Sequence, residues 1–121
     1  MSDARPNHPF PPHDWPEFLE VLRTRPGMYT GARSVRSLGA FMGGFTVAEH
    51  VHGLPEEKHL GGFDFQAFER WVEKAIDDRC WSSFRKAEER AGSDEAGFDL
   101  WYQWYDEFRA ITSTVQSHRS T

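Results

Sequence analysis

The chain has 121 residues, with 14 basic and 19 acidic side chains, a net charge of −5 and a single cysteine. One cysteine excludes a disulfide framework, no run of about 18 apolar residues provides a transmembrane helix, and the acidic balance argues against nucleic-acid binding. Branched aliphatic residues are few beside 10 Phe, 5 Trp and 3 Tyr, so we expect one folded domain whose core is built from aromatic rings.

The N-terminal segment divides into an arm and a first helix. Residues 1–13 hold four prolines, which favour extended backbone, and we predict a disordered proline-rich arm there. Asp14 is expected to cap the first helix, because residues 14–17 read DWPE, a capping pattern with proline in the first turn. The sequence RPGMYTG over 25–31 ends this helix in a predicted type II turn, with Met28 and the ring that follows it pointing inward.

Four further helices are predicted from apolar residues at helical spacing and from capping residues at their starts. Their ranges are 34–52, 64–76, 81–90 and 95–111, and a frayed tail is predicted for 112–121. The 34–52 helix is expected to bury Val35, Leu38, Phe41, Met42, Phe45, Ala48 and Val51. No strand-like alternation occurs, so the sequence predicts an all-α, single compact domain over 14–111 with about five helices.

The final predicted helix carries more rings than one buried stripe accepts. Phe98, Trp101, Tyr105 and Phe108 recur on one line. Tyr102 and Trp104 lie off that line, and with Trp15 they are the rings left over from the predicted core. We therefore expect Tyr102 and Trp104 to be exposed. The acidic residues expected to form a rim beside them are Asp99, Asp106 and Glu107.

An arginine-rich region surrounds the turn. Between residues 23 and 36 the chain has four arginines and no acid. Arg25, Tyr29, Arg33 and Arg36 are expected near a helix N-terminus, where free backbone N–H groups favour anions. A simpler interpretation is a packed turn whose arginines pair with the acidic second half of the chain.

The sequence lacks the motifs of common catalytic chemistry. The sequence contains no G-x-S-x-G, P-loop, C-x-x-C or H-E-x-x-H pattern, so no catalytic residue and no cofactor is assigned. A metal site using Glu49, His52 and His59 is weakly specified, and scattered surface histidines are the favoured interpretation. Cys80 is expected to be a part-buried, inert thiol.

Two resemblances accompany these patterns. Residues 18–31 resemble the R-x-R-P-G-M-Y-I-G stretch in the ATPase region of type II topoisomerase B subunits. Continuing that alignment places the family's general-base Glu near Gly44 and its magnesium-binding Asn near Ala48, and neither residue type is present. The resemblance therefore implies a shared helix–turn–helix packing device without ATP hydrolysis.

The chain also resembles small, largely uncharacterised bacterial proteins. These share a helix followed by R-P-G-M-Y-x-G and an acidic-aromatic final helix, here residues 95–108. Immunity proteins of bacterial toxin systems have similar size and acidity. This comparison is an analogy between general classes of protein.

These observations favour a small acidic cytoplasmic protein-binding module. The more specific hypothesis is an immunity-like or antitoxin-like protein. Exposed aromatic rings with an acidic rim suit docking onto a basic protein such as a nuclease. The alternative is a binder of, or an enzyme acting on, a small anionic ligand at the arginine-rich turn. A homodimer that packs its Gly39 and Gly43 faces is a third possibility. No membrane contact is expected, and the absence of a signal sequence favours the cytoplasm.

Overall fold

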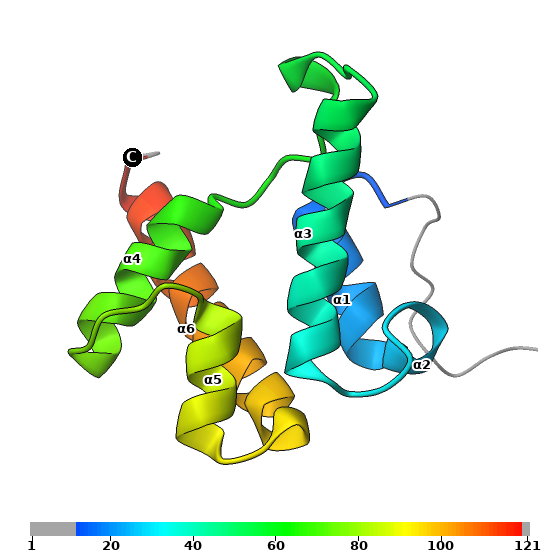
Figure 1. The fold of residues 1–121 in the computed structure, drawn as a ribbon. Helices are drawn as coiled ribbons and strands as arrows, with labels where there is room; N and C mark the ends of the chain where they lie inside the picture. The colour runs from blue at the N-terminus through cyan, green and yellow to red at the C-terminus, as the bar shows by residue number, and fades with distance from the viewer. Residues whose placement is uncertain (1–11, 120–121) are drawn as a thin grey trace, which may run out of the picture.

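A computed structural model describes the backbone of residues 12–119 and the side chains of residues 12–112. Over these residues the chain is all-α, without a strand, and the helices share one aromatic-rich core (Figure 1). The elements are α1 (Trp15–Thr24), α2 (Pro26–Tyr29), α3 (Val35–Val51), the 3-10 turn η1 (Glu56–Lys58), α4 (Phe65–Ile76), α5 (Ser83–Ala91) and α6 (Asp94–Arg119). The predicted arm over 1–13 lies outside the described residues up to residue 11.

Three predicted helix starts are confirmed by side-chain caps. The Asp14 carboxylate accepts the Glu17 N–H at 2.9 Å, at the start of α1. Ser34 Oγ caps α3 through a 3.0 Å bond, and Asp64 caps α4 at the same distance. Each such cap contributes about 1 kcal/mol, and together they set the direction in which three helices leave their loops.

The predicted type II turn is a short helix instead. In α2, Thr30 N–H donates to the Pro26 carbonyl at 2.9 Å, because proline in the first turn suits a helical start as well as a turn. The inward orientation expected for Met28 is wrong, since this side chain is 66% exposed. Tyr29 does pack inward, with its ring 5.8 Å from that of Phe18.

Two boundaries differ from the prediction in the second half. The helix predicted from residue 81 begins at Ser83, and Trp81 lies before it with 88% of its surface exposed instead of pointing inward. Helix α6 continues to Arg119, beyond the predicted end at 111, because neither glycine nor proline follows to interrupt it. The helical backbone does not measure fraying, so the frayed tail over 112–121 stays a prediction.

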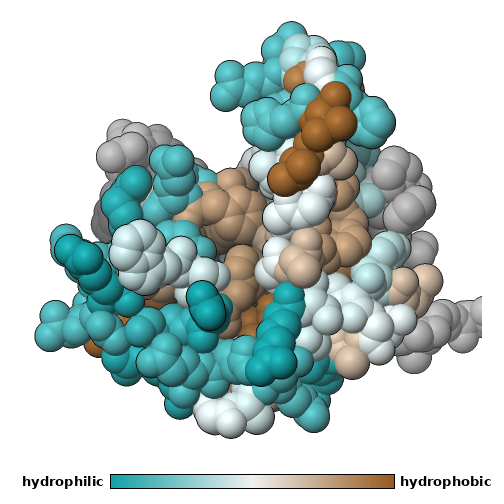
Figure 2. Space-filling view, viewed as in Figure 1, coloured by the Kyte–Doolittle hydropathy of each residue, from teal (hydrophilic) through white to brown (hydrophobic). Residues whose placement is uncertain are grey.

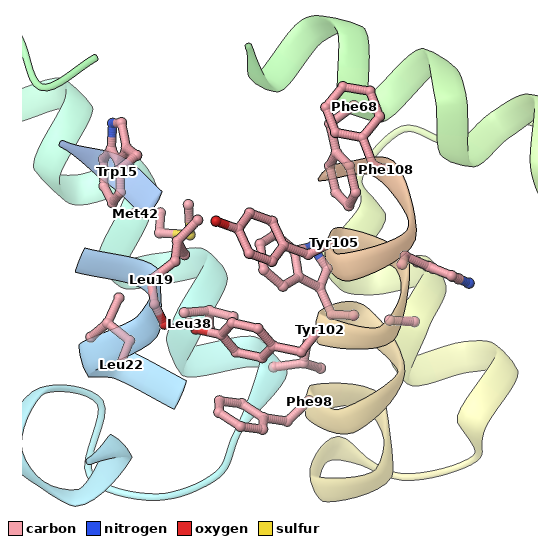
Figure 3. Close-up of a cluster of buried hydrophobic side chains, with 14 of the residues drawn as sticks. Trp15, Leu19, Leu22, Leu38, Met42, Phe68, Phe98, Tyr102, Tyr105 and Phe108 are labelled. Atoms are coloured by element: carbon pink, nitrogen blue, oxygen red, sulfur yellow. Dashed lines mark hydrogen bonds between the residues drawn. The ribbon is translucent and has the colours of Figure 1, made fainter. Parts of the chain in front are cut away.

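Helix α6 organises the packing. It lies along α5, both helices contact α3, and α6 also contacts α4 (Figure 1). Gly97 allows α5 and α6 to approach closely, since a Cβ there would lie 2.8 Å from the Glu88 Cα. Figure 3 shows rings from α6, Phe98, Tyr102 and Tyr105, pointing toward the aliphatic side chains of α1 and α3.

Candidate functional site

The aromatic rings expected to bind a partner are buried. Tyr102 is 4% exposed and Trp104 is 6% exposed, and the third leftover ring, Trp15, is 3% exposed. The expected exposure of Tyr102 and Trp104 is therefore wrong. These rings are buried because α6 contacts α3, α4 and α5. The neighbouring helices cover more of α6 than the single apolar stripe on which the prediction was based.

Tyr102 holds α6 against α1. Its hydroxyl donates a 2.6 Å hydrogen bond to the Leu19 carbonyl, and the Arg23 guanidinium lies 4.4 Å from its ring centroid. Burial raises the pKa of the Tyr102 hydroxyl well above its usual range, and burial also raises the pKa of Tyr105 to about 12. Both hydroxyls stay protonated at neutral pH, as structural groups.

Two of the predicted rim acids pair with arginines of the same chain. Asp106 accepts from Arg23 Nη2 at 2.6 Å, and Asp99 pairs with Arg33. Glu107 contacts Gln103 on its own helix, at 3.4 Å from Nε2 to Oε1. Among the α6 side chains that the structure describes, up to residue 112, these contacts and the burial of the rings leave no aromatic docking surface with an acidic rim.

The arginine-rich turn also pairs with acids. Arg33 contacts Glu95 at 3.3 Å as well as Asp99, and Arg36 Nε lies 2.8 Å from the Glu88 carboxylate. The remaining two candidates belong to the α1–α2 junction, where Arg25 is half-buried and Tyr29 packs against Phe18 and Phe41.

The residues of the arginine-rich turn lower the pKa of two neighbouring acids. The hydrogen bond from Arg36 holds the pKa of Glu88 below its usual range. The Arg36 backbone N–H and the Ser34 hydroxyl lower the pKa of Asp94 in the same way. Acids therefore occupy the positions around Arg33 and Arg36 that an anionic ligand would take, as in the packed-turn interpretation.

A buried polar network joins α4, α5 and α6. The Glu69 carboxylate accepts the Ser83 N–H and hydroxyl, each at 2.8 Å, and Trp101 Nε1 donates to Ser83 Oγ at 2.9 Å. Burial and the Glu69 carboxylate raise the pKa of the Cys80 thiol to about 11, which agrees with an inert thiol. Ser83 is fully buried, so no substrate reaches its hydroxyl.

Two of the three residues weighed for a metal site, Glu49 and His59, have other partners. The Glu49 carboxylate accepts the Leu60 N–H at 2.7 Å, and His59 Nε2 donates to the Leu54 carbonyl at 2.9 Å. The His59 ring packs edge-on against His50, with 5.2 Å between centroids. Among the side chains that the structure describes, no group of three or more His, Cys, Asp and Glu is arranged to hold a metal ion.

The outward side of α3 is apolar, a feature that was not among the predictions from the sequence. We call it the α3 outer face, and its exposed residues are Ala40, Gly43, Gly44, Val47, Ala48 and Val51. Val47 is 60% exposed and Val51 is 74% exposed, and Figure 2 shows hydrophobic side chains over this part of α3. Residues 37–48 carry no charge, although a surface helix ordinarily presents polar residues to water.

A signal for this face was present in the sequence. Positions four apart share one side of a helix, and Gly43, Val47 and Val51 are such a row. The expected burial of Ala48 and Val51 is wrong, because α3 buries only Val35, Leu38, Met42 and Glu49 completely. A helix with two apolar sides leaves the choice of buried side to tertiary packing.

The comparisons with known proteins leave the resemblances untested. No helix in the described part of the chain is long and apolar enough to cross a membrane. No family model, curated protein or solved structure matches the chain.

Proposed function

We propose that this chain is a small acidic protein-binding module whose docking surface is the α3 outer face. The observation that carries this proposal is the exposure of Val47 and Val51 on an uncharged stretch of helix. Exposed apolar side chains that are grouped together mark interaction surfaces, whereas isolated ones need no explanation. The partner that suits this face is an apolar helix or ridge of a protein.

Most of the other large exposed apolar side chains lie on different elements of the fold, which supports the choice of α3 as the docking surface. Met28 belongs to α2, Trp81 to the α4–α5 loop and Ile111 to α6. Leu54, which is 45% exposed, follows α3 directly and extends the apolar region past its C-terminus. Exposed apolar groups thus gather at α3 and are scattered elsewhere.

The charge of the chain favours an immunity-like or antitoxin-like role for this protein-binding module. The net charge is −5, and Glu56 and Glu57 are exposed just beyond α3. Acidic side chains beside an apolar surface raise the association rate with a basic protein. A cytoplasmic location belongs to the same proposal.

A photo-crosslinking residue at position 47 tests the docking surface. We expect the full chain carrying p-benzoylphenylalanine in place of Val47 to give a discrete adduct in its native cells. The same residue in place of Ile111, which is 49% exposed on α6, is the matched control and should give none. The absence of any adduct at position 47 would refute the proposal, as would equal adducts at both positions.

A folding control accompanies this experiment. Because the Val47 side chain is largely exposed, its replacement should change the free energy of unfolding by less than about 0.5 kcal/mol. Urea denaturation of the substituted and original chains measures this change directly. An adduct formed by a chain of unchanged stability therefore reports contact with the native α3 outer face.

A further inference from the structure

Three basic side chains without an ion-pair partner lie at the C-terminal end of α4. Arg70 and Lys74 are exposed on this helix, four positions apart and therefore on one side of it, and Arg79 is exposed in the loop that follows. The ion pairs among the side chains of residues 12–112 include none of the three. By contrast, two arginines of the arginine-rich turn pair with acids of the same chain. Positive charge that another molecule can use is therefore grouped at α4 rather than at the turn.

Two tryptophans flank these cations. Trp81, in the loop between α4 and α5, has 88% of its surface exposed, and Trp71 is half-buried on α4. An open hollow of about 780 Å³ is lined by Arg70, Trp71, Lys74 and Arg79, and an adjoining one of about 250 Å³ is lined by Arg79 and Trp81. We call the surface formed by these five residues the α4 corner.

The loop that presents Trp81 is anchored on both sides. Before the tryptophan, the Asp78 carboxylate accepts a 2.9 Å bond from Lys86 Nζ on α5. After it, the Ser83 N–H donates to the Glu69 carboxylate on α4 at 2.8 Å. Figure 1 shows that α4 runs away from α3 toward this loop. Because a preorganised loop loses little conformational entropy on binding, Trp81 is suited to anchor a partner.

From these features we propose that the α4 corner binds an acidic segment of a partner protein. Trp81 is the apolar anchor, and the three cations bind carboxylates of the segment. Tryptophan and arginine are enriched among the residues that dominate the energy of protein interfaces, and arginine binds carboxylates through paired hydrogen bonds. The α4 corner is separate from the α3 outer face, so this inference goes beyond the proposed function.

The acids beside the α4 corner restrict what binds there. Glu73, Asp77 and Asp78 also line the larger hollow, and of these Asp78 is already bonded to Lys86. A continuous polyanion, such as single-stranded nucleic acid, would bring its closely spaced charges against Glu73 and Asp77. A protein segment with a few separated carboxylates places them on the cations alone. The mixed charge of this surface therefore favours a protein partner.

A synthetic peptide of glutamates interrupted by leucines tests this binding on the full chain. Trp15, Trp101 and Trp104 are buried, so acrylamide first quenches the fluorescence of the two tryptophans in the α4 corner. We expect the peptide to bind with a Kd below about 1 mM and to protect this fluorescence. The same peptide with glutamine at every glutamate should bind at least about fivefold more weakly. Absence of binding, equal affinity for both peptides, or binding without protection would overturn the inference.

Substitutions identify the surface that the peptide occupies. Trp81→Ala should raise the Kd by about tenfold or more, as the loss of a dominant interface residue does, without changing stability in urea, because this ring is exposed. Arg79→Gln and Lys74→Gln should each raise the Kd about two- to fivefold. Lys58→Gln removes another exposed charge, from η1, and should leave the Kd unchanged. If Lys58→Gln weakens binding as much as Arg79→Gln does, net charge alone attracts the peptide and the inference is wrong.

Two further probes test the choice of a protein segment. Oligo(dT) and phosphatidylglycerol vesicles should each bind the chain more weakly than the acidic peptide. Tighter binding of either probe that is lost in Trp81→Ala would overturn the protein partner. The proposed function is tested at position 47 on α3 and this inference at position 81, so each can fail while the other stands.

Discussion

The hydroxyl of Tyr102 on α6 donates a 2.6 Å hydrogen bond to the main-chain carbonyl of Leu19 on α1. This bond joins two residues that lie 83 positions apart in the sequence, and it satisfies a hydroxyl that would otherwise be buried without a partner. Arg23, one turn after Leu19 on α1, covers the ring and pairs with Asp106. Tyr102, which was expected on the surface, thus links α6 to α1.

Removal of this hydroxyl should weaken the fold. We expect Tyr102→Phe to lower the free energy of unfolding by about 1 kcal/mol, the usual net contribution of one hydrogen bond. Urea denaturation followed by circular dichroism measures the loss. Tyr29→Phe, which alters a half-buried ring outside this contact, is the control and should cost less; equal losses would show that the Leu19 bond contributes little.

Stability should decline in alkali because of the same buried tyrosines. Burial raises the pKa of Tyr105 from its ordinary value of 10.0 to about 12, and Tyr102 is shifted in the same direction. The unfolded chain therefore loses these protons first, so their stabilisation is complete below pH 10 and is lost as the pH rises toward 12. Urea midpoints measured across this range should fall, and Tyr102→Phe should make the fall shallower.

Glycine-to-alanine changes should have opposite effects at two helical positions. Gly97→Ala places a Cβ 2.8 Å from the Glu88 Cα on α5, and we expect a loss of about 1–3 kcal/mol from overpacking. Gly44→Ala meets nothing within 4 Å and should stabilise the fold by about 1 kcal/mol through helix propensity. Thermal unfolding compares the two, and a stabilised Gly97→Ala chain would contradict the close α5–α6 packing.

The buried Ser83 should matter far more than its exposed neighbour Trp81. Ser83→Ala leaves the Trp101 N–H without its acceptor and removes a donor from Glu69, for which we expect a loss of about 1–3 kcal/mol. Trp81→Ala removes a side chain that is 88% exposed and should change the free energy of unfolding by less than about 0.5 kcal/mol. Denaturant titration of both variants decides whether the network or the exposed ring supports the fold.

Acid should destabilise the fold through the carboxylates around Arg36. The folded pKa of Glu88 lies below its ordinary 4.5, and that of Asp94 lies below 3.8. Their stabilisation is present above those ordinary values and is lost as the pH falls through the lower folded ones. Arg36→Gln removes the charge that lowers the pKa of Glu88, so thermal scans below pH 5 should show a smaller acid-dependent fall in melting temperature.

Local signals in the sequence determined most of the helices. Asp14, Ser34 and Asp64 each cap a helix where the sequence predicted one. A cap is a contact between residues three apart, and helical spacing is likewise local, so neither depends on the rest of the fold. Because the composition left few aliphatic residues, the aromatic core was also predictable.

Only the tertiary structure decided which faces of the helices are covered. Tyr102 and Trp104 lie off the apolar stripe of α6, yet they are buried, because neighbours pack around that helix on several sides. Val47 and Val51 are equally apolar but exposed, because within one copy of the chain nothing covers that side of α3 over the described residues. Burial depends on contacts between segments far apart in the sequence, and periodicity within one segment carries no information about those contacts.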